Sequence, residues 1–159
     1  MMDIQLLNQA AAFIWQEADM LDHGEFADWL DQWSEDGLYI IPIDPAQTDF
    51  ANALNYAYDD QTTRKKRVKR LTSGESISTS PQPRTVRQIS RFRLLSNEGD
   101  VVTVRCAQFL SEFRKDKIRH CTADLTFTLL RHGDSFRIQQ KLIRLINSDD
   151  ALSCIGYIL

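Results

Sequence analysis

The sequence contains few of the residues that bind metals or form disulfide bonds. It has three cysteines and three histidines among 159 residues. Cys106, Cys121 and Cys154 lie far apart and form no C-x-x-C pair, so a zinc site or a thioredoxin-type motif has no support. We expect three reduced thiols that are buried or half-buried, because free cysteine packs like a small apolar residue.

Long apolar segments and a strong charge of one sign are also missing. No apolar run approaches the roughly 20 residues that span a bilayer. Residues 1–4 lack the basic flank and apolar stretch of a signal peptide. The formal net charge of −3 gives no global attraction to nucleic acid or to anionic membranes. We therefore expect a cytoplasmic protein that binds neither.

The length favours a single domain over residues 1–159, and such a chain buries a core without disulfide bonds. Its most regular part is a series of three long strands, over residues 101–114, 118–131 and 135–147. Polar turns separate them at Lys115-Asp116 and at His132-Gly133-Asp134. Runs of β-branched and aromatic residues joined by such turns are typical of antiparallel hairpins.

The middle strand alternates between two faces. Successive side chains of a strand point to opposite sides, so one face is apolar and the other is polar. The apolar face carries Cys121, Ala123, Leu125, Phe127 and Leu129, and the polar face carries His120, Thr122, Asp124, Thr126 and Thr128. The apolar face needs a cover.

The N-terminal part supplies helices for that cover. Apolar residues at spacings of three and four predict a helix over about residues 3–22, with Gly24 in the left-handed position after it. A second helix carries Phe26, Trp29, Leu30 and Trp33 on one side and ends before Asp36-Gly37, where a short strand over residues 38–41 begins. We expect Trp15, Trp29 and Trp33 to belong to the helix core.

The middle of the chain is less regular. Residues 44–58 are ambiguous between loop and strand. Asp59-Asp60 is a suitable N-cap for a third helix that continues to about Leu71. Residues 72–83 are rich in Ser, Thr, Pro and Gly and predict a loop, and residues 84–95 predict a strand. The apolar residues 155–159 predict a tail that is held against the fold.

Helices followed by long antiparallel strands predict an α+β fold, with the helices on one face of a curved antiparallel sheet. Four blocks of sequence then suggest a family. They are residues 21–42; Tyr58-Asp59-Asp60 with Arg67-Val68-Lys69-Arg70-Leu71; Pro83-Arg84-Thr85-Val86-Arg87; and Phe136-Arg137-Ile138 with Lys141, Leu145 and Asn147. In this order, over about residues 10–150, the chain resembles the small (beta) subunits of aromatic-ring-hydroxylating dioxygenases.

The resemblance implies a fold and a role. The fold is the cone-like, nuclear transport factor 2-like (cystatin-like) fold. The role is that of a non-catalytic, structural beta subunit in aromatic compound catabolism, which forms a homotrimer and binds alpha subunits. The resemblance also implies that the alpha subunit holds the Rieske iron–sulfur cluster and the mononuclear iron, and that this chain holds no cofactor.

The residues themselves agree with metal centres in another chain. A Rieske cluster needs paired C-x-H and C-x-x-H motifs, and neither occurs here. A mononuclear Fe(II) site needs two His and one carboxylate. His132-Gly133-Asp134 is an H-x-D sequence, but Gly133 falls where a hairpin turn is expected, so we interpret His132 and Asp134 as solvated turn residues.

Two alternatives remain open. The same superfamily includes stand-alone SnoaL-like dehydratases and isomerases, which use an acid–base pair inside the cone. His120 and Asp124 share a strand face, and imidazole titrates near neutral pH, so these two residues, with Tyr39 and Asp22, are the catalytic candidates. The polar face instead lies at the surface if the apolar face lines the cone. A small-ligand or dimerisation module without chemistry is the other alternative.

The run Arg64–Arg70 has six cations in seven residues. A solvated helix face is the ordinary interpretation. The functional one is contact with an acidic surface of a partner, because charge complementarity orients docking. Arg87, Arg91 and Arg93 are expected to share one strand face and to serve the same docking. The residues that we expect to dock the partner are Arg67, Lys69, Arg70, Arg87 and Arg91.

Overall fold

The computed structural model describes residues 2–73, 83–146 and 156–159. Cys154 and most of the loop predicted over residues 72–83 lie outside the described residues. Helix α1 (Ile4–Asp22) confirms the predicted N-terminal helix. The Asp3 carboxylate caps it by accepting a hydrogen bond from the backbone N–H of Leu6 at 3.0 Å. Gly24 follows the helix with a φ of +69°, as expected for its C-terminal turn.

Helix α2 (Phe26–Asp31) is shorter than the sequence predicts. Trp33 begins strand β1 (Trp33–Pro42), so the prediction that this residue is helical is wrong. The ring of Trp33 nevertheless enters the same core as Trp29, with their ring centroids 5.4 Å apart. Because both rings are buried there, their four-residue spacing in the sequence resembles that of a helix. At Gly37, an added Cβ would lie 2.8 Å from the carbonyl oxygen of Ile138, because β1 passes very close to the neighbouring strand.

The ambiguous stretch holds a short 3₁₀ helix, η1 (Phe50–Asn52), and strand β2 (Asn55–Asp59). Helix α3 (Gln61–Ser73) follows. The Asp60 carboxylate accepts a hydrogen bond from the backbone N–H of Thr63 at 2.9 Å, which confirms the predicted N-cap. None of the helices in the described residues is long and apolar enough to cross a membrane.

Four long strands complete the fold: β3 (Arg84–Glu98), β4 (Val101–Arg114), β5 (Lys117–His132) and β6 (Ser135–Leu145). They form the predicted meander of hairpins. Lys115 and Asp116 have φ values of 53° and 61° in the β4–β5 turn, which is the backbone geometry of a two-residue hairpin loop.

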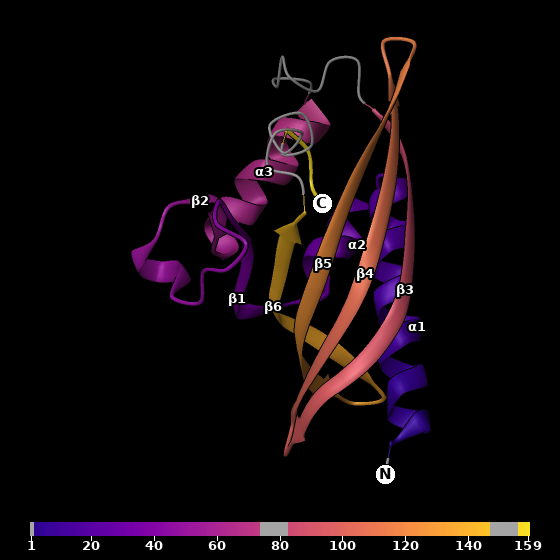
Figure 1. Cartoon of the computed structure of the whole chain (residues 1–159), viewed down its shortest axis with the longest axis vertical. Helices are drawn as coiled ribbons and strands as arrows, with labels where there is room; N and C mark the ends of the chain where they lie inside the picture. Colours follow the sequence, from indigo (N-terminus) through magenta and orange to yellow (C-terminus); the bar gives the residue numbers. More distant parts are fainter. Residues whose placement is uncertain (1, 74–82, 147–155) are drawn as a thin grey trace.

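The six strands form one sheet in the order β2-β1-β6-β5-β4-β3. Neighbouring strands are antiparallel except β1 and β6, which pair in parallel. The predicted antiparallel sheet is therefore a mixed sheet. Figure 1 shows β3, β4 and β5 as long curved strands with α1 and α2 behind them, and α3 beside β1 and β2. We call the space between the curved sheet and these helices the cone interior.

The alternation predicted for the middle strand is confirmed. Its apolar residues are buried and belong to the core that α1 covers, and they include Leu125, Phe127 and Leu129. Cys106 is a buried free thiol, as expected, and Cys121 is also buried. Trp15 departs from its prediction, because 52% of its surface is exposed. Its indole N–H donates a hydrogen bond to the carbonyl of Ile89 at 2.8 Å, so it packs at the edge of the core.

Two β-bulges change which side chains face inward. In β3 the register shifts between Ser90 and Arg93, and Arg91 has a φ of 58°. In β6 the register shifts between Ile138 and Gln140. These two residues are two apart in β6, but they pair with Leu129 and Thr128, which are adjacent in β5. An extra residue in one strand reverses the alternation beyond it. As a result, Lys141 points into the core and is completely buried.

Candidate functional site

Five ionisable side chains meet in the cone interior, and we call them the interior cluster: Glu17, Asp22, Tyr39, Arg87 and Lys141. Lys141 and Glu17 form its centre. The Lys141 ammonium group donates a hydrogen bond to Glu17 Oε2 at 2.8 Å, and the indole N–H of Trp29 donates to the same oxygen at 2.8 Å. This is a buried ion pair with a third, neutral partner.

The tail segment, residues 156–159, bonds to this cluster through its main chain. Lys141 Nζ donates to the main-chain oxygen of Leu159 at 2.5 Å. The backbone N–H of Leu159 donates to the phenol oxygen of Tyr39 at 2.8 Å. The Arg87 guanidinium group donates to the Ile158 carbonyl oxygen. Tyr157, Ile158 and Leu159 are all buried, which confirms the prediction that the apolar tail is held against the fold.

Asp22 closes the other side of the cluster. Its carboxylate pairs with the Arg87 guanidinium group. It also accepts hydrogen bonds from the Thr85 hydroxyl and from the backbone N–H of Arg87, both at 2.9 Å. The Asp22 carboxylate is therefore engaged by three donor groups, and it orients Arg87 toward the tail.

Burial is the largest cause of the pKa shifts of Tyr39 and Lys141. Burial raises the pKa of Tyr39 to about 12, although the nearby Arg67 charge opposes this change. Burial lowers the pKa of Lys141, and the Glu17 carboxylate opposes the change by favouring the ammonium form. Tyr39 is therefore a neutral phenol at physiological pH, and its oxygen serves as a hydrogen-bond acceptor for the tail.

The four predicted acid–base residues do not form one site. Asp22 and Tyr39 belong to the interior cluster. His120 is exposed on the opposite face of the sheet, where its Nδ1 lies 3.0 Å from the Ser111 hydroxyl. Asp124 shares that outer face and pairs with Arg91 at 2.7 Å. Four residues of strand separate His120 from Asp124 by about 13 Å, so the expected shared face is present but direct proton transfer between them is not possible.

The predicted docking residues also divide into two groups. Helix α3 turns Arg64 and Arg67 toward the fold. The Arg64 guanidinium carbon lies 4.2 Å from the centroid of the Trp33 ring, and Arg67 pairs with Asp59 at 2.6 Å. The basic run is therefore not a uniformly solvated face, because these two cations pack against aromatic and acidic groups of β1 and β2. Four cations of the run remain exposed: Lys65, Lys66, Lys69 and Arg70.

The predicted common face of Arg87, Arg91 and Arg93 is wrong. The bulge at Arg91 reverses the alternation of β3, so Arg87 is buried while Arg91 and Arg93 are exposed. Arg87 is occupied by Asp22 and the tail.

Sequence reasoning missed Glu17 and Lys141 as members of a cluster. A signal was present for each. Glu17 falls on the apolar face of α1, three residues after Ile14 and four before Leu21. Lys141 precedes Ile143 and Leu145 at the two-residue spacing of an inward-facing strand. A single charged residue at a core position predicts a buried partner of opposite charge.

The outer face of the sheet carries exposed apolar side chains near the β4–β5 turn. We call Val86, Phe109, Phe113 and Ile118 the outer apolar patch; their exposed fractions range from 43% to 66%. Phe113 pairs with Ile118 across β4 and β5, so these two lie side by side. A hollow of about 640 Å³ adjoins three of the four patch residues. Contiguous exposed apolar surface of this kind marks an interaction site.

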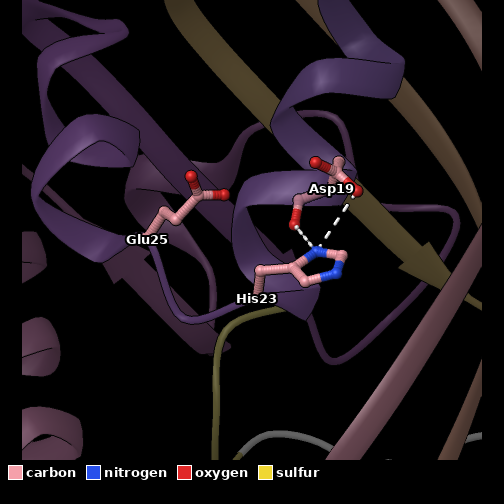
Figure 2. A group of neighbouring side chains, drawn as sticks. All are labelled: Asp19, His23 and Glu25. Atoms are coloured by element: carbon pink, nitrogen blue, oxygen red, sulfur yellow. Dashed lines mark hydrogen bonds and ion pairs between the residues drawn. The ribbon is translucent and has the colours of Figure 1, made fainter.

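His120 and His132 do not share an iron site of the two-His, one-carboxylate type. His120 and His132 lie twelve residues apart on β5, or about 40 Å. Figure 2 shows the one group in the described residues whose ligand atoms come close together: Asp19, His23 and Glu25, all exposed and within 4.8 Å. His23 Nδ1 already bonds to the Asp19 carbonyl oxygen at 2.9 Å. This bond and the Asp19 charge raise the pKa of His23, which favours a protonated helix cap over a metal ligand.

The fold defines the class of protein first. A protein from Novosphingobium aromaticivorans, described as NTF2-like with a cystatin-like fold, superimposes with a TM-score of 0.62 at 14% identity, over 96% of this chain and 91% of that one. Naphthalene 1,2-dioxygenase contains a chain that superimposes with a TM-score of 0.79 at 18% identity, covering 93% of this chain and 82% of that one. The protein therefore has the nuclear transport factor 2-like cone fold, as predicted.

The sequence comparisons then define the family. The family described as the ring hydroxylating beta subunit matches residues 16–149, so the chain belongs to that family. The small subunit of anthranilate 1,2-dioxygenase from Acinetobacter baylyi is 26% identical, over 92% of this chain and 93% of that subunit. The beta subunit of benzoate 1,2-dioxygenase from Burkholderia mallei is also 26% identical and superimposes with a TM-score of 0.74, over 94% of this chain and 95% of that one.

Proposed function

We propose that this chain is a structural beta subunit whose contribution to an aromatic-ring-hydroxylating dioxygenase is assembly and stability. The observation that carries the proposal is the engagement of the cone interior. Lys141, Arg87 and Tyr39 all bond to the chain's own tail, so these polar groups are not presented to a substrate. In this proposal the Rieske cluster and the mononuclear iron belong to a partner alpha subunit, and the substrate is bound there.

The outer apolar patch is the surface that we propose for self-association as a trimer. It lies on the sheet face opposite the helices, and polar residues such as His120 and Ser111 are next to it. Apolar groups surrounded by polar ones are the usual composition of a stable interface. A ring of three copies is a closed assembly, which limits further growth. We place the complex in the cytoplasm, where the buried thiol of Cys106 stays reduced.

The exposed cations of α3 are the surface that we propose for docking to the alpha subunit. The helix contains six basic residues and no acidic one, although the whole chain has a net charge of −3. This local excess favours a partner with an acidic surface. Arg67 contributes to the fold rather than to docking, because its guanidinium group is paired with Asp59.

The double charge reversal Lys69→Glu and Arg70→Glu tests this docking surface. Both side chains are exposed, so the fold is expected to stay intact while attraction to the acidic partner becomes repulsion. We expect at least tenfold weaker binding to the alpha subunit at low salt, and a smaller difference at 0.5 M salt because ions screen exposed charges. Binding is measured by surface plasmon resonance with immobilised alpha subunit.

Reversal of Arg91 and Arg93 is the matched control for this experiment, since these cations are exposed on another strand. If docking uses α3, this control reduces binding less than the α3 reversal does. Unchanged affinity of the α3 variant at low salt would remove α3 from the proposed interface.

A stand-alone dehydratase or isomerase is less well supported. Its four candidate residues divide between the interior cluster and the outer sheet face. Asp22 and Tyr39 are engaged by Arg87 and by the tail, and Asp124 is paired with Arg91. No specific contact of His120 favours catalysis over an ordinary surface hydrogen bond to Ser111.

A further inference from the structure

The tail segment makes contacts of the kind that a bound peptide makes. Three side chains from three different strands reach its main chain: Tyr39 from β1, Arg87 from β3 and Lys141 from β6. Together they satisfy two main-chain oxygens and one N–H of Ile158 and Leu159. Main-chain hydrogen bonds combined with buried side chains are how proteins hold extended peptides.

The chemistry of the cluster defines what else fits there. Lys141 and Arg87 present donors, and the neutral Tyr39 phenol presents an acceptor to an N–H group. Around them the pocket is apolar, and it buries the side chains of Ile158 and Leu159 almost completely. Without the tail, the Lys141 ammonium and the Arg87 guanidinium would each lose one buried acceptor and keep only Glu17 and Asp22 respectively. A buried donor with too few acceptors is unfavourable. The site therefore requires a short apolar ligand with main-chain-like carbonyl and N–H groups.

We propose that the cone interior is a binding site for a short apolar peptide and that the chain's own residues 156–159 are its internal ligand. Such peptide binding would be a function of this chain in addition to its structural role. With the tail seated, the interior is closed to small molecules. With the tail displaced, the site accepts an equivalent peptide from solution.

The test uses the full chain with the tail made unable to seat. Ile158→Asp places a carboxylate in an apolar pocket, and Leu159→Lys places a second cation near Lys141. The probe is the synthetic peptide Gly-Tyr-Ile-Leu, and the control probe is Gly-Tyr-Asp-Lys. Binding is measured by isothermal titration calorimetry, and folding is followed by circular dichroism. We expect one Gly-Tyr-Ile-Leu peptide to bind per variant chain, no binding to the unaltered chain, and no binding of the control peptide.

The outcomes are decisive even if the double variant unfolds. In that case Gly-Tyr-Ile-Leu, and not the control peptide, is expected to restore the circular dichroism of the native fold, since a ligand of the native state stabilises it. Adding Tyr39→Phe to the double variant removes one acceptor and is expected to weaken binding about fivefold. A folded variant that binds no peptide, an unfolded one that the peptide does not rescue, or equal binding to the unaltered chain would overturn the proposal.

Discussion

Replacing Lys141 with methionine is expected to destabilise the protein more than any exposed lysine substitution. Lys141 is 0% exposed and Glu17 is 1% exposed, and the two are joined by a 2.8 Å hydrogen bond. The substitution leaves the Glu17 carboxylate buried with only the Trp29 N–H as a partner. Removing one member of a buried ion pair costs about 3–5 kcal/mol of unfolding free energy. Urea denaturation of the variant and of the unaltered chain measures the difference.

Two further variants separate this effect from a general loss of lysine. Lys66→Met changes an exposed cation, and surface substitutions of this kind shift stability by only about 0.5 kcal/mol. The double variant Glu17→Gln with Lys141→Met removes both charges and keeps an acceptor for Trp29. We expect it to be more stable than Lys141→Met alone. If Lys141→Met is as mild as Lys66→Met, the buried pair does not contribute as described.

Introducing a carboxylate into the outer apolar patch is expected to convert the proposed trimer into monomers. Phe109→Glu places a charge on each of three copies at a surface that becomes desolvated on association. Burying an unpaired charge costs several kcal/mol per site, which exceeds what one apolar contact contributes. The side chain is 53% exposed in the single chain, so the monomer itself tolerates the change. Size-exclusion chromatography with light scattering at micromolar concentration gives the mass.

Leu54→Glu is the matched control for the patch. Leu54 is 82% exposed and precedes β2, which forms the other edge of the sheet from β3. This variant is expected to keep the mass of the unaltered chain. A trimer that survives Phe109→Glu, or one that Leu54→Glu disrupts, would place the self-association surface elsewhere.

Regular periodicity explains which parts of the fold were predictable. The spacing of apolar residues in α1 and the strict alternation of β5 follow directly from helix and strand geometry, and both are confirmed. The parallel pairing of β1 with β6 was not predictable from local pattern. It depends on strands that are about 100 residues apart and on the close approach at Gly37.

The candidate site was less predictable, because β-bulges decide its composition. One inserted residue near Arg91 reverses the alternation of β3 beyond it, so Arg91 is exposed while Arg87, which lies before the bulge, is buried. The expected common face is therefore absent. Another in β6 turns Lys141 toward Glu17. A bulge leaves little trace in a single sequence. The tail was expected to be held against the fold, but its partners come from three strands, and only the folded chain brings these together.

We propose that this chain works as a structural subunit beside an iron-bearing partner. The most direct test is affinity purification of the tagged chain from its native host, followed by native mass spectrometry and iron analysis of the eluted complex. We expect equal amounts of this chain and of a larger chain with paired C-x-H and C-x-x-H motifs, with the iron in that larger chain. An iron-free assembly of this chain alone, active on a small substrate by itself, would contradict it.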